Sequence, residues 1–170
     1  MQGEYLLDSA ATQTGQRFSG LEATFDGATF RYLAATGVGA GWSCWEIAAG
    51  GGSIARWLAE QVVPGGCVLA TDLEIKWMPA EPAAVRVARH DVASDPVPEN
   101  AHDLIHARLV LVHLPERDRV LTALAAALRP GGWLVVEDFD SAFDDGTRPK
   151  RSAGRFPCWK IPPSSGQCRS

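Results

Sequence analysis

Residues 45–55 read WEIAAGGGSIA: an apolar run holds an acidic residue near its end, three glycines follow, and an amphipathic helical pattern begins. This order predicts a strand, a tight turn and the N-terminus of a helix. Glycines let the backbone turn sharply and let a ligand approach it closely. The first turn of a helix adds free N–H groups and the positive end of its dipole. The segment therefore predicts a ligand site at the tip of a strand.

A second acidic residue supports this interpretation. Asp72 lies twenty residues after Gly52, at the end of the apolar run CVLAT at 67–71. An acidic residue at that offset is placed to accept hydrogen bonds from ribose hydroxyls. The pair of strand tips thus favours a cofactor that contains a nucleoside. The alternative is structural: Gly50 and Gly52 make only a tight turn, and Asp72 caps the short helix that follows.

The register of the glycines separates two cofactor classes. Starting from Gly50, the segment fits G-x-G-x-x-A, a dinucleotide fingerprint. Starting from Glu46, it fits E-x-A-x-G-x-G, which resembles motif I of the class I S-adenosylmethionine-dependent methyltransferases, usually E/D-x-G-x-G-x-G. A carboxylate at Glu46 suits a ligand with an ammonium group and would repel the pyrophosphate of a dinucleotide. We therefore favour the second register.

The resemblance to these methyltransferases extends over about residues 17–140. It is carried by TDL at 71–73, RHDV at 89–92, HDLIHAR at 102–108, LVHL at 111–114 and LRPGGWLVVED at 128–138. One such motif is weak evidence, whereas five in the family's order and spacing are specific. The resemblance implies a Rossmann-like α/β fold with strand order 3-2-1-4-5 and S-adenosylmethionine as the cofactor, leaving S-adenosylhomocysteine as product.

The resemblance also implies a set of cofactor-binding residues. They are Glu46, Ala48, Gly50 and Gly52 in the loop, Asp72 and Leu73 at the ribose, Asp91 and Val92 at the adenine, and Ala107 and Arg108 on the fourth strand. Ala48 stands where the family usually has its first glycine, so we expect its methyl group to crowd the methionine end of the cofactor.

Several of these residues keep a structural alternative. Asp91 could serve a turn, and Arg108 could orient a carboxylate or be a solvated strand end. His106 and His113 suggest acid–base chemistry, although a histidine among apolar neighbours is more often structural. No catalytic residue is assigned, because a sulfonium is already an activated donor and the protein mainly positions donor and acceptor. The sequence accordingly does not identify the methyl acceptor.

The periodicity predicts alternating elements. Helices are expected at 21–36, 53–62 and 116–128, with only a short, proline-broken one at 74–82. Strands are expected at 43–48, 67–71, 84–90 and 104–108, with a fifth after the Pro-Gly-Gly turn at 130–132. Strands that alternate with helices indicate a doubly wound, mostly parallel α/β sheet.

Composition changes abruptly near residue 140. Residues 141–170 hold six Lys/Arg against two Asp/Glu, while the preceding residues hold ten against eighteen. We therefore predict a methyltransferase-like domain at 1–140 and a basic, Pro-rich, irregular or disordered tail at 141–170. The family's C-terminal antiparallel hairpin is then missing, as in a truncated enzyme. Strand five would lie bare at the sheet edge, where residues 133–136 could join a homodimer. The alternative is that the tail folds back irregularly and covers this edge, with Phe143, Phe156, Trp159 and Ile161 as its apolar anchors.

Bulk properties exclude several classes. The net charge of −4 gives no strong case for a nucleic-acid binder. The sequence shows no signal peptide and no apolar run long enough for a membrane span. The four cysteines lack metal-ligand spacing, so no metal is expected, and a cytoplasmic location fits best.

Three functions remain open at this point. The first is an S-adenosylmethionine-dependent methyltransferase acting on a small molecule, slowed by its short C-terminus. The second is a non-catalytic module that binds S-adenosylmethionine or S-adenosylhomocysteine, or a subunit that needs a partner. The third is a nicotinamide-dependent oxidoreductase in the Gly50 register.

Overall fold

The computed structural model describes residues 2–78, 82–139 and 158–160, with side chains for 15–78 and 82–139. In chain order the elements are α1 (Gln2–Ala35), β1 (Ser43–Ile47), α2 (Ser53–Val62), β2 (Cys67–Asp72), the 3₁₀ turn η1 (Ile75–Trp77), β3 (Val85–Arg89), β4 (His102–Arg108), the 3₁₀ turn η2 (Leu111–His113), α3 (Arg117–Ala127), β5 (Leu128–Glu137) and β6 (Cys158–Lys160). None of the helices in the described part of the chain is long and apolar enough to cross a membrane.

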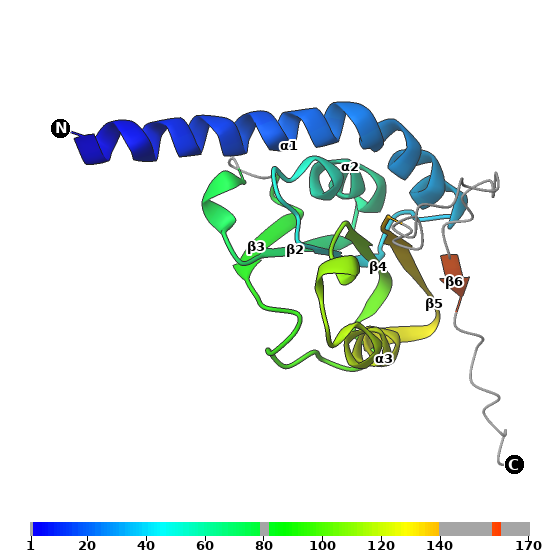
Figure 1. Cartoon of the computed structure of the whole chain (residues 1–170). Helices are drawn as coiled ribbons and strands as arrows, with labels where there is room; N and C mark the ends of the chain where they lie inside the picture. The colour runs from blue at the N-terminus through cyan, green and yellow to red at the C-terminus, as the bar shows by residue number, and fades with distance from the viewer. Residues whose placement is uncertain (1, 79–81, 140–157, 161–170) are drawn as a thin grey trace, which may run out of the picture.

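The strands form one sheet in the order β3-β2-β1-β4-β5-β6, and β1 to β5 are parallel. Helices α1 and α2 cover one face, and α3 covers the other (Figure 1). Helix α1 runs across the width of the molecule above α2. The predicted α/β class and the strand order 3-2-1-4-5 are therefore confirmed.

Alternation along the strands divides the core into two clusters. Cys44, Leu104 and Val135 point to the face under α1 and α2, where they pack with Leu33 and Leu58. The residues between them point to the α3 face: Trp45, Ile105 and Leu134 pack there with Val120 and Leu124. The period of two along each strand fixes which later residues share a face.

The parity places charged residues under α1. Two residues beyond Cys44, Leu104 and Val135 come Glu46, His106 and Glu137, which therefore continue the α1 face of the sheet. All three are buried. The apolar core under α1 thus gives way to a polar layer at the carboxyl ends of β1, β4 and β5.

Most predicted elements occur close to their expected bounds. Helix α2 begins and ends where it was expected, and η1 replaces the short helix predicted at 74–82. Helix α1 is far longer than the predicted 21–36, because its helix continues back to Gln2. Strand β4 begins two residues early at His102, and β5 already includes the Pro-Gly-Gly segment expected to precede it.

The expected bare edge of strand five is wrong. Strand β6 pairs antiparallel with β5, joining Trp133 to Lys160, Leu134 to Trp159 and Val135 to Cys158. The backbone of β5 is therefore already paired over residues 133–135, which removes the basis for a homodimer through that edge. Three residues of the predicted irregular tail thus form a strand, and the rest of 141–170 lies outside the described residues.

Candidate functional site

The glycine loop links β1 to α2 through three left-handed residues. Ala48 has φ +54°, Gly50 has φ +54° and Gly52 has φ +80°. Glycine adopts such angles without a steric penalty, whereas an alanine at φ +54° is strained by about 1–2 kcal/mol. The family-like glycine position occupied by Ala48 is therefore one where the backbone itself favours glycine. The methyl group is exposed.

Asp72, at the end of β2, holds this loop. Its Oδ2 accepts a hydrogen bond from the Gly50 N–H at 3.0 Å, and its Oδ1 accepts one from the Glu74 N–H at 3.0 Å. Each carboxylate oxygen has a second lone pair and can accept another donor. Asp72 thus stabilises the turn and keeps acceptor capacity for a ligand.

Helix α1 lies directly over the glycines. A Cβ built on Gly50 would lie 3.1 Å from the Phe18 ring, and one built on Gly51 would lie 2.3 Å from the Glu22 carboxylate. The absence of side chains at these positions therefore lets α1 pack closely on the loop. This packing supplies a structural reason for both glycines beside the ligand-binding one.

A cavity of about 410 Å³ opens at the carboxyl ends of β1, β2 and β4. Its lining residues come from α1, the glycine loop, the strand ends and η2: Arg17, Phe18, Leu21, Glu22, Glu46, Ala48, Ala49, Gly50, Gly51, Ser53, Ile54, Asp72, Arg108, Leu109, His113 and Phe139. The structure thus brings five of the predicted site residues to one cavity, namely Glu46, Ala48, Gly50, Asp72 and Arg108.

The other five predicted site residues do not line this cavity. Gly52 is buried at the start of α2, Ala107 belongs to the core on the α3 face, and Val92 packs against that core. Leu73 is exposed. Asp91, which was predicted to bind the adenine, is engaged in a turn instead.

The Asp91 carboxylate accepts hydrogen bonds from the Ala93 N–H at 2.9 Å and from the Ser94 hydroxyl at 3.0 Å. The Ala93 N–H and then the Ser94 hydroxyl lower the pKa of Asp91. This is the turn role that the sequence left open as an alternative.

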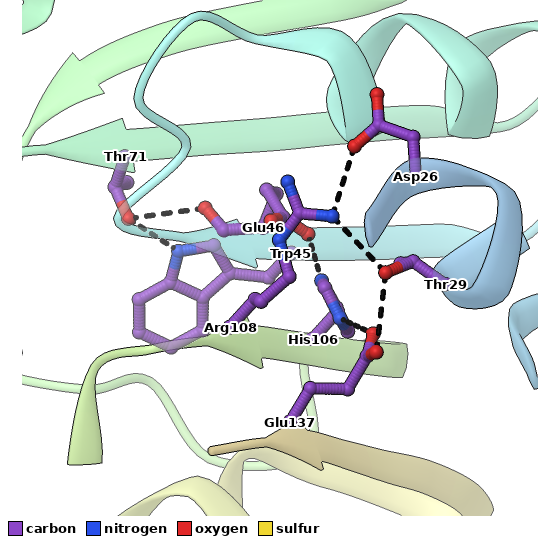
Figure 2. Close-up of polar contacts among 8 residues, drawn as sticks. All are labelled: Asp26, Thr29, Trp45, Glu46, Thr71, His106, Arg108 and Glu137. Atoms are coloured by element: carbon purple, nitrogen blue, oxygen red, sulfur yellow. Dashed lines mark hydrogen bonds and ion pairs between the residues drawn. The ribbon is translucent and has the colours of Figure 1, made fainter. Parts of the chain in front are cut away.

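A chain of polar contacts includes Glu46 and Arg108, two residues that line the cavity (Figure 2). His106 Nδ1 is 2.6 Å from Glu46 Oε2, and His106 Nε2 is 2.9 Å from Glu137 Oε1. The Thr29 hydroxyl of α1 donates to Glu137 Oε2 at 3.1 Å. The imidazole therefore bridges two carboxylates, one of which is also bound by α1.

Arg108 provides a second link to α1. Its Nη1 donates to Asp26 Oδ1 at 2.9 Å and to Thr29 Oγ1 at 3.1 Å. Its side chain is 13% exposed, so this ion pair is partly shielded from water. Arg108 lines the cavity while its guanidinium is held by the helix above it, and the six residues form one connected group in Figure 2: Asp26, Thr29, Glu46, His106, Arg108 and Glu137.

The buried charges shift one another. Burial alone would lower the pKa of His106, but Glu46 and Glu137 outweigh it and raise that pKa to about 9. Burial raises the pKa of Glu46, against the lowering effects of His106 and Arg108. The group as a whole therefore retains a proton well above the pH at which an isolated imidazole loses it.

The sequence analysis missed part of this group. Glu137 carries the same signal as Glu46, an acidic residue at the end of an apolar strand, and could have been found by it. Asp26 and Thr29 lie three residues apart on α1, but nothing local indicates that they face the sheet. Arg17 and Phe18 were also missed, since the helix containing them was expected to begin only at residue 21. Glu22 lay within the expected helix, but no local signal indicated that it faces the glycine loop.

Residues 15–78 and 82–139 contain no cluster of His, Cys, Asp and Glu that could hold a metal ion. Among the charged residues at the cavity, Glu46 is paired with His106, Arg108 with Asp26, and Asp72 with the backbone.

The parallel sheet, the glycine loop at the tip of β1 and the acidic end of β2 define a domain of the nucleoside-cofactor-binding α/β class. A family model described as a methyltransferase domain matches residues 15–167. The chain therefore belongs to that family, the class I S-adenosylmethionine-dependent methyltransferases, which decides against the nicotinamide alternative.

Individual relatives agree with the family. Methyltransferase str2 of Strobilurus tenacellus is 39% identical over 100 residues, which cover 57% of this chain and 35% of that protein. A solved S-adenosylmethionine-dependent methyltransferase from Mesorhizobium loti is 26% identical, with TM-score 0.56, covering 64% of this chain and 52% of the other.

A second solved structure shares the fold at lower identity. A SAM-dependent methyltransferase from Aquifex aeolicus has TM-score 0.57 at 21% identity, covering 70% of this chain and 68% of that one. The matched region spans about a third of the length of methyltransferases str2 and str3 of Strobilurus tenacellus.

Proposed function

We propose that this chain binds S-adenosylmethionine in the cavity at the tips of β1, β2 and β4 and methylates a small molecule. One observation carries the proposal: Glu46 and Asp72, the two strand-end carboxylates, line the same cavity as the glycine loop. The cavity volume of about 410 Å³ is within the range of small-ligand sites, roughly 300–1,000 Å³.

Each end of the cavity suits one part of that cofactor. Asp72 has spare acceptor capacity for ribose hydroxyls, and Glu46 offers negative charge to the ammonium group of the methionine end. Gly50 lines the cavity between them, with its N–H bound to Asp72 and the Phe18 ring of α1 packed against it. Ala48 and Arg108 complete the wall near Glu46, and we assign no ligand contact to Gly52, Leu73, Asp91, Val92 or Ala107.

We further infer that this chain binds the methyl donor but transfers the methyl group slowly or not at all. Methyl transfer needs an acceptor held in line and shielded from water. Three of the residues that line the cavity away from the loop, Arg17, His113 and Phe139, are exposed. Among the described residues, none of these is held by a hydrogen bond that would orient an acceptor.

Calorimetric titration tests the binding proposal directly. We expect S-adenosylmethionine and S-adenosylhomocysteine to bind with one site per chain and NAD to show no heat of binding. NAD binding without S-adenosyl binding would overturn the proposal.

Turnover is tested separately by following S-adenosylhomocysteine release with a panel of phenols, amines and carboxylic acids. We expect slow or absent release although the donor binds. Fast turnover with any acceptor would show that the chain is a fully competent enzyme and would contradict the inference about the acceptor side.

A further inference from the structure

His106 occupies an unusual place relative to the cavity. It is fully buried, it does not line the cavity, and both its ring nitrogens contact carboxylates. A side chain that never meets a ligand cannot act as its acid or base. Its effect on a bound molecule must therefore pass through a residue that it holds.

Glu46 is that residue. Its Oε2 is 2.6 Å from His106 Nδ1, and the Glu46 side chain lines the cavity. A buried carboxylate without a partner is costly, because burial disfavours its charge. The imidazolium N–H groups stabilise the ionised form of Glu46 and restrict its rotamers, since a charge-assisted hydrogen bond is short and directional.

Glu137 fixes the other side of the ring. It accepts from His106 Nε2 at 2.9 Å and from the Thr29 hydroxyl at 3.1 Å, so α1 and β5 together set the position of the imidazole. Because both ring nitrogens face carboxylates, the protonated ring donates to both at once. A neutral ring could donate to only one of them.

The charges of this group do not sum to zero, and the excess negative charge lies at the cavity. Among the described residues, the titratable groups linked to the ring by hydrogen bonds or ion pairs, directly or through Thr29, are Glu46 from β1, Glu137 from β5, Arg108 from β4 and Asp26 from α1. With the ring protonated, three carboxylates face two cations. One negative charge remains, and Glu46 is the only carboxylate of this group that lines the cavity.

We propose that His106 is a positioning residue that holds Glu46 ionised and oriented for the ammonium group of an S-adenosyl ligand, anchored through Glu137 and Thr29 to α1. This inference rests on the proposed function, because it assigns a task to one end of the same cavity. His106, which lies on β4 outside the cavity, then affects recognition of the amino-acid end of the ligand and not of its nucleoside end.

Two ligands separate these ends. S-adenosylhomocysteine carries the ammonium group, whereas 5′-methylthioadenosine keeps the adenosine and the thioether but lacks the amino-acid end. For His106→Gln we expect the Kd of S-adenosylhomocysteine to rise at least tenfold and that of 5′-methylthioadenosine to change less than threefold. A general loss of structure would weaken both ligands together.

The matched control is His102→Gln. His102 is a second buried histidine of β4, at the opposite end of the strand, where its Nδ1 contacts Ser43 Oγ at 3.3 Å. The same substitution there should leave both dissociation constants unchanged. A selective loss in His102→Gln equal to that in His106→Gln would contradict the proposal.

Glu137→Gln and Thr29→Val provide a second line if His106→Gln does not fold. Neither residue lines the cavity, yet both should weaken S-adenosylhomocysteine selectively, by about threefold to tenfold. Equal losses for the two ligands, or no loss in any variant, would overturn the positioning role. Failure of the wild-type chain to bind S-adenosylhomocysteine would instead refute the proposed function itself.

Discussion

The carboxyl ends of the parallel strands fall into two halves that are built in different ways. At the ends of β1, β4 and β5, the buried side chains bind one another, with His106 between Glu46 and Glu137. At the ends of β2 and β3, the acidic side chains are only half-buried and bind nearby backbone: Asp72 binds two loop N–H groups, and Asp91 binds its own turn.

The two halves differ in how strongly folding depends on the identity of one side chain. A backbone-bound carboxylate depends on a local turn that other polar residues can also support. A carboxylate paired with a buried imidazole depends on that one partner, because removing it leaves uncompensated charge in the core. The backbone-bound half, at the ends of β2 and β3, should therefore tolerate substitution in the folded state. The buried half, at the ends of β1, β4 and β5, should not.

The sharpest test of this difference is His106→Leu. It removes the shared partner of two buried carboxylates, so we expect a loss of about 3–5 kcal/mol in the free energy of unfolding. Urea unfolding followed by circular dichroism measures it, with Asp72→Ala as the comparison from the other half. A loss below 1 kcal/mol for His106→Leu would mean that the buried group contributes no more than a surface pair.

Stability should also fall as the solution becomes alkaline. The folded-state pKa of His106, about 9, lies above its ordinary value of 6.5. A raised pKa means that the folded state binds more protons, so this contribution is complete below about pH 6.5 and is lost as pH rises through 9. The total is up to about 3 kcal/mol, at roughly 1.4 kcal/mol per pKa unit.

The free energy of unfolding measured between pH 6.5 and 9 checks this slope. The range stops at 9 because burial raises the pKa of the Cys44 thiol to about 12, which contributes at higher pH. In His106→Gln the slope over this window should flatten, and an unchanged slope would assign the protons to another group.

The backbone-bound half should matter for binding more than for folding. Asp72→Ala removes the proposed ribose acceptor, so S-adenosylhomocysteine affinity should fall by about 1.5–3 kcal/mol, the range for a hydrogen bond to a charged group. Calorimetry measures it, with Asp91→Asn as the matched carboxylate on the neighbouring strand. Unchanged affinity in Asp72→Ala would refute the ribose assignment.

The sequence predicted the half of the site that local motifs encode. The glycine loop, Asp72 and the strand order follow from short patterns, because a strand–turn–helix unit is specified within about ten residues. Glu46 was singled out by the same kind of local pattern, and it lines the cavity. These features depend on neighbours in the chain, which a single sequence displays.

The buried group could not be predicted because it is assembled across the fold. His106 meets Glu46 sixty residues away and Glu137 thirty-one residues away, and Thr29 reaches Glu137 across 108 residues. Only the register of β1, β4 and β5 brings these side chains to one face. The long α1 was underestimated for a related reason: its N-terminal half lacks a strong apolar stripe, so the periodicity begins late.

The smallest expected effect concerns Ala48, which joins the two halves at the loop. Its φ of +54° favours glycine. Ala48→Gly relieves about 1–2 kcal/mol of strain and offsets part of this gain with about 0.4–1 kcal/mol of added freedom in the unfolded chain. We therefore expect a net gain of up to about 1 kcal/mol in the free energy of unfolding, read from the urea midpoint at constant slope. The same variant removes the methyl group from the cavity wall beside Glu46, so S-adenosylhomocysteine affinity should stay equal or improve.

Leu109→Gly is the matched comparison, because Leu109 is also left-handed at φ +57° and lines the same cavity, yet loses a half-buried side chain on substitution. If Ala48→Gly destabilised the fold as much as Leu109→Gly, the loop would need the methyl group for packing, and backbone strain would no longer explain why this position favours glycine.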